Sequence, residues 1–311
     1  MRYLTLAILL TGSLSTLPLY ASVTDSSHSA SETIIQVQLN QLLPTQAAIG
    51  YDQVYYKLAR FAQAPQAVLE EYCETNGQLG LSHASNKASL QDPASFGCQA
   101  AVGSDPQSMK TVVIGPQQQL YLTDGHHTFT SLWEHPDAGP ELTMHVRVSA
   151  DFSDSPDLEH FWQRMQQANK VWLRSGTNQA IEPQQLPKQL GLQQLDNDPY
   201  RALVYFTRGG AYEKPRSGNT PIEYLEFYWG NWLRPQLDLR QYNLNSLKSY
   251  QQAVTAASQL MVKAAADQPI TNTGLTPQQL GGYQRLNRKK LNKTLTNKVP
   301  LALQARTQAT P

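Results

Sequence analysis

The residue types best suited to chemistry gather in one short segment, Asp124-Gly125-His126-His127-Thr128. Apolar positions alternate with polar ones before this segment, as in a strand, and recur at helical spacing after it. Since Asp-Gly is a turn dipeptide, the segment is predicted to join that strand to that helix. It then places a carboxylate and two imidazoles at the first turn of the helix. Unpaired N–H groups and the helix dipole make such a helix start suited to anions, above all to phosphate.

The side chains of this turn allow two kinds of catalysis and one structural role. Because His126 and His127 are adjacent, their side chains diverge by about 100° on a helix, which disfavours one metal ion bound by both. Asp124 with one histidine can hold a divalent ion, Mg²⁺ or Ca²⁺, with phosphate oxygens completing the shell. Alternatively, one histidine acts as general base or acid and the other donates to phosphate. In the structural role, Asp124 caps the helix and a histidine hydrogen-bonds a backbone carbonyl.

These roles predict different responses to substitution. If the imidazoles act on phosphate, alanine at His126 and His127 should abolish binding or turnover and leave the fold intact. Alanine at Asp124 should lower stability and activity together, because it removes a cap as well as a metal ligand.

Three segments give the chain a resemblance to a known family. The turn 124–128, placed after a hydrophobic strand, resembles the signature of the putative ParB-like nuclease family within the ParB/sulfiredoxin superfamily. Residues 43–50 resemble the Pro-Thr-Gln stretch that leads into a helix in that family, and residues 197–201 with 226–229 are a weaker third match. The resemblance spans roughly residues 33–234. It implies a phosphodiesterase or nuclease that acts on a phosphate-containing substrate, with nucleic acid among the candidates.

The resemblance also implies which residues bind the substrate phosphate. Thr45 and Gln46 belong to the Pro-Thr-Gln stretch, which lines the same pocket as the turn in this family, and Lys57 lies on the helix that follows. Gly125 and Thr128 complete the implied set. From the residues alone, Thr45 is equally suited to cap a helix and Lys57 to a solvated helix face.

Two departures from related families narrow the activity. Sulfiredoxins carry a cysteine where this chain has His126, so sulfiredoxin chemistry is excluded. Free serine kinases carry an arginine where this chain has Thr128, which disfavours triphosphate binding because arginine contacts phosphate with two donors at once. A phosphoryl-transfer enzyme resembling those kinases, and a non-enzymatic module that binds an anionic or phosphate-bearing ligand, remain as alternatives.

The N-terminus predicts an exported protein. Residues 1–21 have the positive start, apolar core and small-residue cleavage site of a signal peptide, with cleavage after Ala21. Residues 22–32 are predicted to be a disordered leader. The apolar run is too short for a membrane anchor, and no later segment is long enough, so the bacterial periplasm is the expected compartment. Because that compartment is oxidising, Cys73 and Cys98 are expected to form a disulfide, with two free thiols as the alternative.

Hydrophobic periodicity divides the rest of the chain into a mixed part and a helical part. Residues 33–150 are predicted to form a mixed α+β or α/β domain of the ParB/sulfiredoxin type. Within it, residues 76–109 are expected to be a long polar loop. Residues 151–270 are predicted to be mainly helical, and residues 271–311 to form a basic polar tail.

Two charge patterns in the helical part allow both a functional and a structural interpretation. Glu223 and Glu226 share a predicted helix face, which allows paired-carboxylate chemistry, although a face turned to water is favoured. The net charge of +1 predicts no general attraction to nucleic acid. A local basic stretch is either a solvated helix face with a frayed tail or a polyanion-binding arm. It contains Arg285, Arg288, Lys289, Lys290, Lys293 and Lys298.

Overall fold

The computed structural model describes residues 33–215, 222–272 and 274–309. The predicted signal peptide, residues 1–21, and the predicted leader, residues 22–32, lie outside this part of the chain. Within the described part, no helix is long and apolar enough to cross a membrane.

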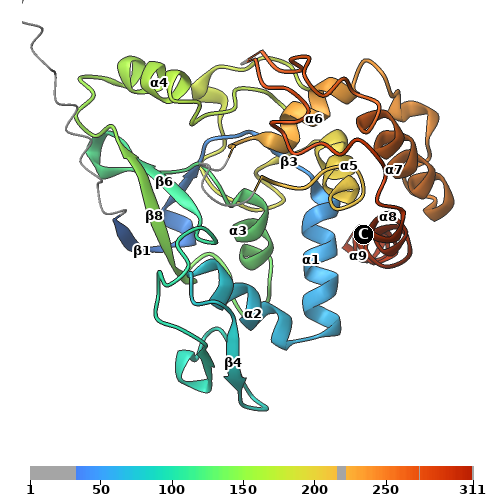
Figure 1. Cartoon of the computed structure of the whole chain (residues 1–311). Helices are drawn as coiled ribbons and strands as arrows, with labels where there is room; N and C mark the ends of the chain where they lie inside the picture. Colours follow the sequence, from blue (N-terminus) through green and yellow to red (C-terminus); the bar gives the residue numbers. More distant parts are fainter. Residues whose placement is uncertain (1–32, 216–221, 273, 310–311) are drawn as a thin grey trace, which may run out of the picture. The chain divides into compact units, whose positions relative to one another are not determined.

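A mixed sheet organises the N-terminal half. Its strands are β1 (Ile34–Gln38), β2 (Leu42–Pro44), β6 (Thr111–Ile114), β7 (Leu120–Leu122) and β8 (Thr143–Asp151). Among the described residues these five strands lie in the order β1-β8-β6-β7-β2. Figure 1 labels β1, β8 and β6 of this sheet. β2 runs parallel to β7, and their last residues, Pro44 and Leu122, are register partners. The segments that leave these two strands therefore start side by side at one edge of the sheet.

Successive strand residues point to opposite faces of a sheet. Both faces of this sheet carry apolar residues, and helices cover both. They are α1 (Tyr51–Gln63), α2 (Gln66–Thr75), α3 (His126–Trp133) and α4 (Leu158–Gln167). Val112 and Leu122 point to the face covered by α1, α2 and α3. Val113 and Tyr121 point to the opposite face, where they pack against Phe161 of α4. The sheet and α1–α3 thereby fix both ends of the segment that carries the turn.

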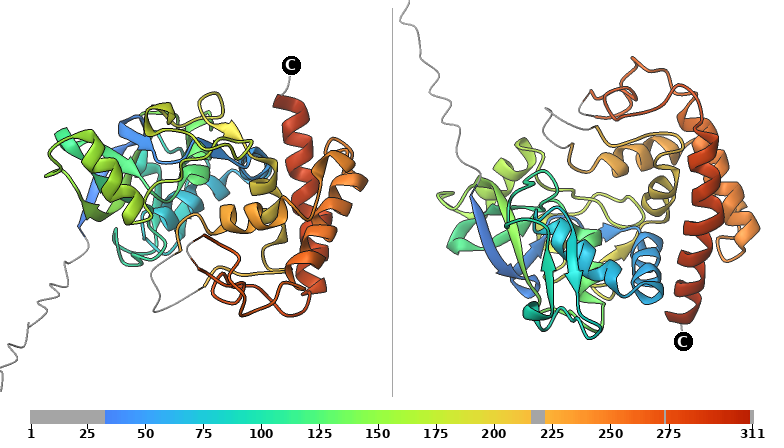
Figure 2. Two further views of the ribbon diagram at one scale, coloured as in Figure 1. Left: turned by 90° about the horizontal axis from the view of Figure 1, so that it is seen from above. Right: turned by 60° about the horizontal axis from the view of Figure 1, so that its bottom comes forward.

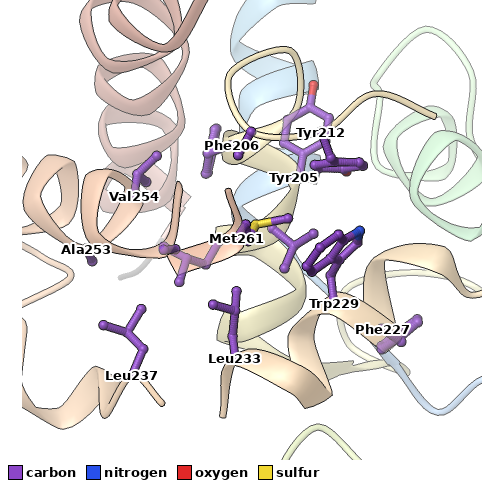
Figure 3. Packing of buried hydrophobic residues seen from close by; sticks show 14 of the residues in the cluster. Tyr205, Phe206, Tyr212, Phe227, Trp229, Leu233, Leu237, Ala253, Val254 and Met261 are labelled. Carbon is purple, nitrogen blue, oxygen red and sulfur yellow. The ribbon is translucent and has the colours of Figure 1, made fainter. Parts of the chain in front are cut away.

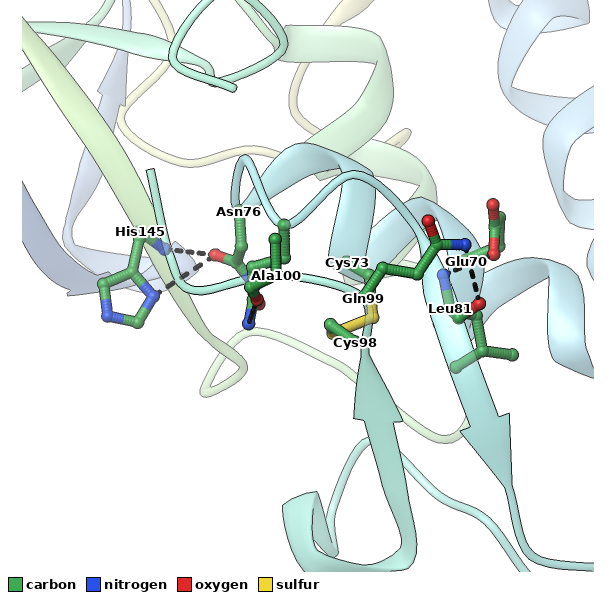
Figure 4. Close-up of a disulfide and its surroundings, with 9 residues drawn as sticks. Glu70, Cys73, Asn76, Leu81, Cys98, Gln99, Ala100 and His145 are labelled. Carbon is green, nitrogen blue, oxygen red and sulfur yellow. Dashed lines mark hydrogen bonds between the residues drawn. A yellow bond between two sulfur atoms is a disulfide. The ribbon is translucent and has the colours of Figure 1, made fainter. Parts of the chain in front are cut away.

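The polar segment 76–109 is more ordered than the sequence predicted, because it contains a hairpin. Its two strands, β4 (Leu81–Ala84) and β5 (Phe96–Cys98), pair antiparallel. Cys98 is bonded to Cys73 in α2, with 5.5 Å between the Cα atoms, so the predicted disulfide is confirmed (Figure 4). Beside it, the side-chain oxygen of Asn76 accepts the backbone N–H of His145 at 2.7 Å, which joins the end of α2 to β8.

Loss of the disulfide is expected to destabilise the protein. The bond joins residues 25 positions apart, and the chain-entropy model gives a loop of this size about 3–4 kcal/mol. Alanine at both Cys73 and Cys98 should therefore lower the free energy of unfolding by about that amount in a denaturant titration. A reducing agent should lower the stability of the wild type and leave the double variant unchanged. Equal unfolding midpoints for oxidised and reduced wild type would contradict the expectation.

The C-terminal half packs its helices around an aromatic core. These helices are α5 (Pro199–Thr207), α6 (Leu225–Leu233) and α7 (Leu247–Met261). Trp229 of α6 is fully buried, and Phe206 of α5 and Met261 of α7 lie in the same cluster (Figure 3). A short parallel pair of strands, β3 (Ala48–Ile49) and β9 (Asp196–Asn197), connects the start of α1 with the start of α5. The chain is thus a mixed α+β structure with a helical C-terminal region, as predicted.

The C-terminal basic stretch is helical, so the expected frayed tail is wrong for residues 288–309. It forms α8 (Arg288–Lys293), a π-helical turn (Thr294–Lys298) and α9 (Val299–Ala309). α9 packs along α1 (Figure 2). Arg306 of α9 pairs with Asp52 of α1 at 2.9 Å, and Val299 and Ala302 are buried. Apolar contacts and an ion pair therefore hold this helix against the domain.

Candidate functional site

The Asp-Gly-His-His-Thr turn lies where β7 ends and α3 begins. Because β2 and β7 are parallel neighbours, Thr45 after β2 starts beside Thr123 after β7. Gly125 has a φ of 113°, in the left-handed region, and lies against the side chain of Lys110. A Cβ atom at Gly125 would come within 2.7 Å of that side chain. Both the backbone angle and the available space therefore require glycine at this position.

His126 and His127 hold the chain segment between β2 and α1. The backbone N–H of Thr45 donates to Nε2 of His126 at 3.2 Å, and that of Gly50 donates to Nε2 of His127 at 2.9 Å. Only 2% of His126 and 7% of His127 is exposed. The expected bond from a histidine to a backbone carbonyl is wrong, because Nε2 of each ring accepts a backbone N–H group instead. Two buried backbone donors therefore depend on these imidazoles.

Both imidazoles are held in the neutral form. Burial lowers the pKa of His126 to about 3, although Asp124 opposes this shift. Burial and the charge of Arg201 hold the pKa of His127 well below its ordinary value. Since Nε2 of each ring accepts a hydrogen bond, the ring hydrogen sits on Nδ1. Neither imidazole offers the free basic nitrogen that general-base catalysis at neutral pH requires.

Asp124 faces outward from the turn, with 48% of its side chain exposed. The N-cap of α3 is Gly125 and no side chain caps this helix, so the expected capping role of Asp124 is wrong. Its Oδ2 lies 3.8 Å from Nζ of Lys110. Partial burial raises the pKa of Asp124, but Lys110 and Lys214 lower it by more, so the group is charged at neutral pH. No side-chain cap therefore occupies the first N–H groups of α3.

A buried carboxylate beside the turn, Glu226 of α6, is surrounded by three cations. Arg208 and Lys214 contact its Oε1, Lys214 at 3.2 Å, and Nη2 of Arg201 lies 3.5 Å from its Oε2. Glu226 and Arg201 each have 5% of their side chain exposed. Burial raises the pKa of Glu226, but the three cations outweigh burial and hold that pKa well below its ordinary value. Arg201 also lies 3.5 Å from Nδ1 of His127, which brings the cluster to the turn.

A second carboxylate from the same region, Glu223, is also buried. It pairs with Lys170 at 2.7 Å and has 10% of its side chain exposed. The expectation that Glu223 and Glu226 face water is therefore wrong, because counter-charges from other elements meet both. Burial, with a smaller effect of the Asp124 charge, raises the pKa of Glu223 to about 7 against the opposing effect of Lys170. A carboxyl group with this pKa gains and loses a proton near neutral pH.

The Pro-Thr-Gln stretch reaches the turn through Thr45 but not through Gln46. Oγ1 of Thr45 donates to the carbonyl of Leu122 at 2.6 Å and lies 2.9 Å from the hydroxyl of Tyr224. The side-chain amide of Gln46 donates to the carbonyl of Ala48 at 2.6 Å, within its own segment. Thr45 therefore joins the turn to the region before α6, whereas Gln46 fixes the local backbone.

Lys57 of α1 reaches Thr128 of the turn. Its Nζ donates to Oγ1 of Thr128 at 3.2 Å and pairs with Glu71 of α2. Burial raises the pKa of Glu71, but Lys57 and Arg60 lower it to about 2. Because its charge is matched by Glu71, Lys57 positions α3 against α1 and α2.

The sequence did not single out the cations around the turn. Arg201 and Glu226 lie in the segments that make the third match of the resemblance, so that match is the signal that could have identified Arg201. Lys110, Arg208 and Lys214 carry no pattern in the sequence. They meet at the site only through the packing of β6, α5 and α6 around the turn.

The chain is similar to one protein family and to a solved structure. A family model described as putative ParB-like nuclease matches residues 35–235. No curated protein matches the chain. Among solved structures, the chain is similar to the crystal structure of protein Atu1540 from Agrobacterium tumefaciens, with 23% identity and a TM-score of 0.49. That similarity covers 73% of this chain and 90% of the other. Since the family match covers most of the chain, this protein belongs to the putative ParB-like nuclease family.

Proposed function

We propose that this protein is an exported phosphodiesterase or nuclease that binds a phosphate group of its substrate at residues 124–128. Membership of the family supports a nuclease-like activity. The disulfide between Cys73 and Cys98 supports export, because such bonds persist in oxidising compartments such as the bacterial periplasm.

The observation that carries this proposal is an excess of positive charge beside the turn. Within the described residues, four cations interact with Asp124 and Glu226, and these two carboxylates are their ion-pair partners. The cations are Lys110, Arg201, Arg208 and Lys214. Because four positive charges meet two negative ones here, a bound anion stabilises this arrangement. A phosphate at the start of α3 also meets the uncapped N–H groups of the helix.

The geometry assigns different tasks to the acidic and imidazole groups. His126 and His127 hold the turn as neutral rings whose Nε2 atoms accept the backbone N–H groups of Thr45 and Gly50. Glu223, with a pKa of about 7, accepts a proton from the attacking water. The resulting hydroxide attacks phosphorus, the P–O ester bond breaks, and the departing alkoxide takes the proton back from Glu223. Lys110 and Lys214 stabilise the negative charge that develops on the phosphate oxygens.

A divalent ion is compatible with Asp124 only if the substrate supplies ligands. Among the described residues, no three His, Cys, Asp or Glu side chains form a metal-binding group. Mg²⁺, however, is commonly held by one or two carboxylates with substrate phosphates and water. Asp124, half exposed beside the uncapped helix start, fits that donor set. A bound ion there supplies Lewis-acid stabilisation of the phosphate.

Neutralising Asp124 or Glu223 is expected to remove the hydrolytic activity. The Asp124 variant should also keep nearly the stability of wild type. Asp124→Asn and Glu223→Gln should each lower kcat/KM for a phosphodiester by about 100-fold or more. Since Asp124 caps nothing, its variant should unfold within about 0.5 kcal/mol of wild type. The wild-type rate should rise with pH and level off above about 7, as Glu223 loses its proton. The measurement is hydrolysis of bis-p-nitrophenyl phosphate and of DNA and RNA, with Mg²⁺, Ca²⁺ or a chelator.

The matched control is Asp267→Asn, which removes an exposed carboxylate at a distance in sequence from the site. Its activity should equal that of wild type. A wild type that hydrolyses none of these substrates, yet binds inorganic phosphate at the turn, would support the non-enzymatic alternative. Full activity in Asp124→Asn and Glu223→Gln would contradict the proposed roles.

A further inference from the structure

The C-terminal region beyond residue 267 is purely basic. From residue 268 to the end, the chain has seven Lys and Arg residues and no Asp or Glu. One of them, Arg306, pairs with Asp52. Five others are exposed and form no ion pair with any described residue. They are Arg285, Arg288, Lys289, Lys290 and Lys293, and we call them the basic surface.

The basic surface is held in place and not on a mobile arm. Leu291 of α8 is 4% exposed and packs in the aromatic core of the C-terminal half. The side chain of Lys290 lies against Gly209, at 3.7 Å from the position of a Cβ atom there. Lys289 and Lys293 are four residues apart and so lie on one face of the helix. Uncompensated positive charge on a fixed helix favours a binding surface over a solvated tail.

This surface continues toward the cations of the turn. Lys298, in the turn after α8, lies over the rings of Tyr56 and Tyr205, at 5.5 Å and 5.3 Å. Arg208 lies over Tyr205 at 5.3 Å and contacts Glu226. Glu213 is the acidic residue whose charge acts on Lys298. Positive charge thus extends from α8 to Arg208 beside the turn.

We infer that the basic surface on α8 binds the phosphate backbone of a nucleic acid strand. The site lies outside residues 35–235, the range of the family match. It does not rest on turnover at residues 124–128, but it implies that the natural substrate is a polymer and not a small phosphodiester. A strand held at α8 is delivered toward Arg208 and the turn.

The composition of this surface favours a nucleic acid over a membrane. Interfacial helices need a large apolar face to enter a lipid surface. Among the described residues, the exposed large hydrophobic side chains all lie outside residues 285–298. The nearby rings of Tyr56 and Tyr205 are covered by Lys298, so they offer no free platform for base stacking. Binding is therefore expected to depend on the backbone charge and to be insensitive to base sequence.

The test compares the mature protein with two triple variants that lose equal charge. The first is Arg288→Gln/Lys289→Gln/Lys293→Gln. The second is Lys87→Gln/Lys188→Gln/Lys263→Gln, which removes three exposed lysines elsewhere. The probe is a fluorescein-labelled single-stranded oligonucleotide of mixed sequence, measured by anisotropy from low to high salt. With five phosphate contacts, log K should fall against log salt with a slope of about −3.5, and removing three contacts should bring it to about −1.4.

The α8 variant should bind the oligonucleotide at least about 10-fold more weakly, while the control variant binds like wild type. Equal weakening of both variants would show a net-charge effect and overturn the inference. A second outcome would also overturn the inference. In it, wild type binds vesicles of anionic lipid more tightly than it binds the oligonucleotide, and the α8 variant no longer binds the vesicles. Because anisotropy measures oligonucleotide binding without turnover, failure of the proposed hydrolysis leaves a distinct result from failure of this surface.

Discussion

Alanine at both His126 and His127 should destabilise the protein by about 2–6 kcal/mol as well as abolish activity. The reason is that each ring accepts a buried backbone N–H, from Thr45 and from Gly50. An unsatisfied buried donor costs about 1–3 kcal/mol. This outcome differs from the expectation based on the sequence, in which a helix start tolerated alanine without loss of stability. The measurement is the free energy of unfolding in denaturant, together with phosphodiester hydrolysis.

Glutamine provides the matched control for the histidines. The acceptor in both bonds is Nε2 of histidine. The side-chain oxygen of glutamine is also an acceptor and lies at a similar distance from the backbone. His126→Gln/His127→Gln should therefore recover more than half of the stability that the alanine pair loses. An alanine pair as stable as wild type would show that the two N–H bonds contribute nothing to folding.

The neutral state of these rings also predicts a pH dependence of stability. Burial lowers the pKa of His126 from 6.5 to about 3, and that of His127 also falls well below 6.5. Between about pH 3 and 6.5 the unfolded chain therefore binds more protons than the folded one. The stability from the neutral rings is present in full above pH 6.5. It is lost as the pH falls, by at most about 1.4 kcal/mol per pH unit for each histidine. The glutamine pair should show a flatter profile over the same range.

Local patterns in the sequence predicted the helices and strands themselves better than which of them pair or pack together. Alternation and helical spacing located β7 and α3, and with them the turn that carries Asp124 and the histidines. The parallel pairing of β2 with β7 depends on contacts between residues far apart in sequence. This pairing puts Thr45 against His126, so that Nε2 of His126 accepts the buried N–H of Thr45.

Glu223 and Glu226 show the same limit. The predicted shared helix face is wrong, because Glu223 lies in the turn before α6 and only Glu226 lies in the helix. A periodic pattern identifies a polar face, but it does not tell whether water or a counter-charge covers that face. Here Lys170, from the segment after α4, reaches Glu223, and Arg201 from α5 reaches Glu226. The resemblance to the family could have identified Arg201, because residues 197–201 and 226–229 are the segments that match the family.

Replacing Glu226 by glutamine should destabilise the protein by about 3 kcal/mol, at the lower end of the range for breaking a buried ion pair. The lower end applies because Arg208 and Lys214 are 26% and 45% exposed and can turn to water. Arg201, with 5% exposed, cannot. Exposed Glu141, changed to glutamine, should have no measurable effect. Stability is measured by denaturant titration.

Inorganic phosphate should restore part of the stability lost in Glu226→Gln. With the carboxylate removed, three cations face no fixed anion, so a phosphate ion should bind more tightly than in wild type and raise Tm by more. Arg201→Gln in the same chain should cancel part of the loss, since the cation that needs the carboxylate is gone. The double variant should therefore be more stable than the sum of the single losses predicts. Strict additivity, with no larger response to phosphate in Glu226→Gln, would show that the cations beside the turn do not form an anion site.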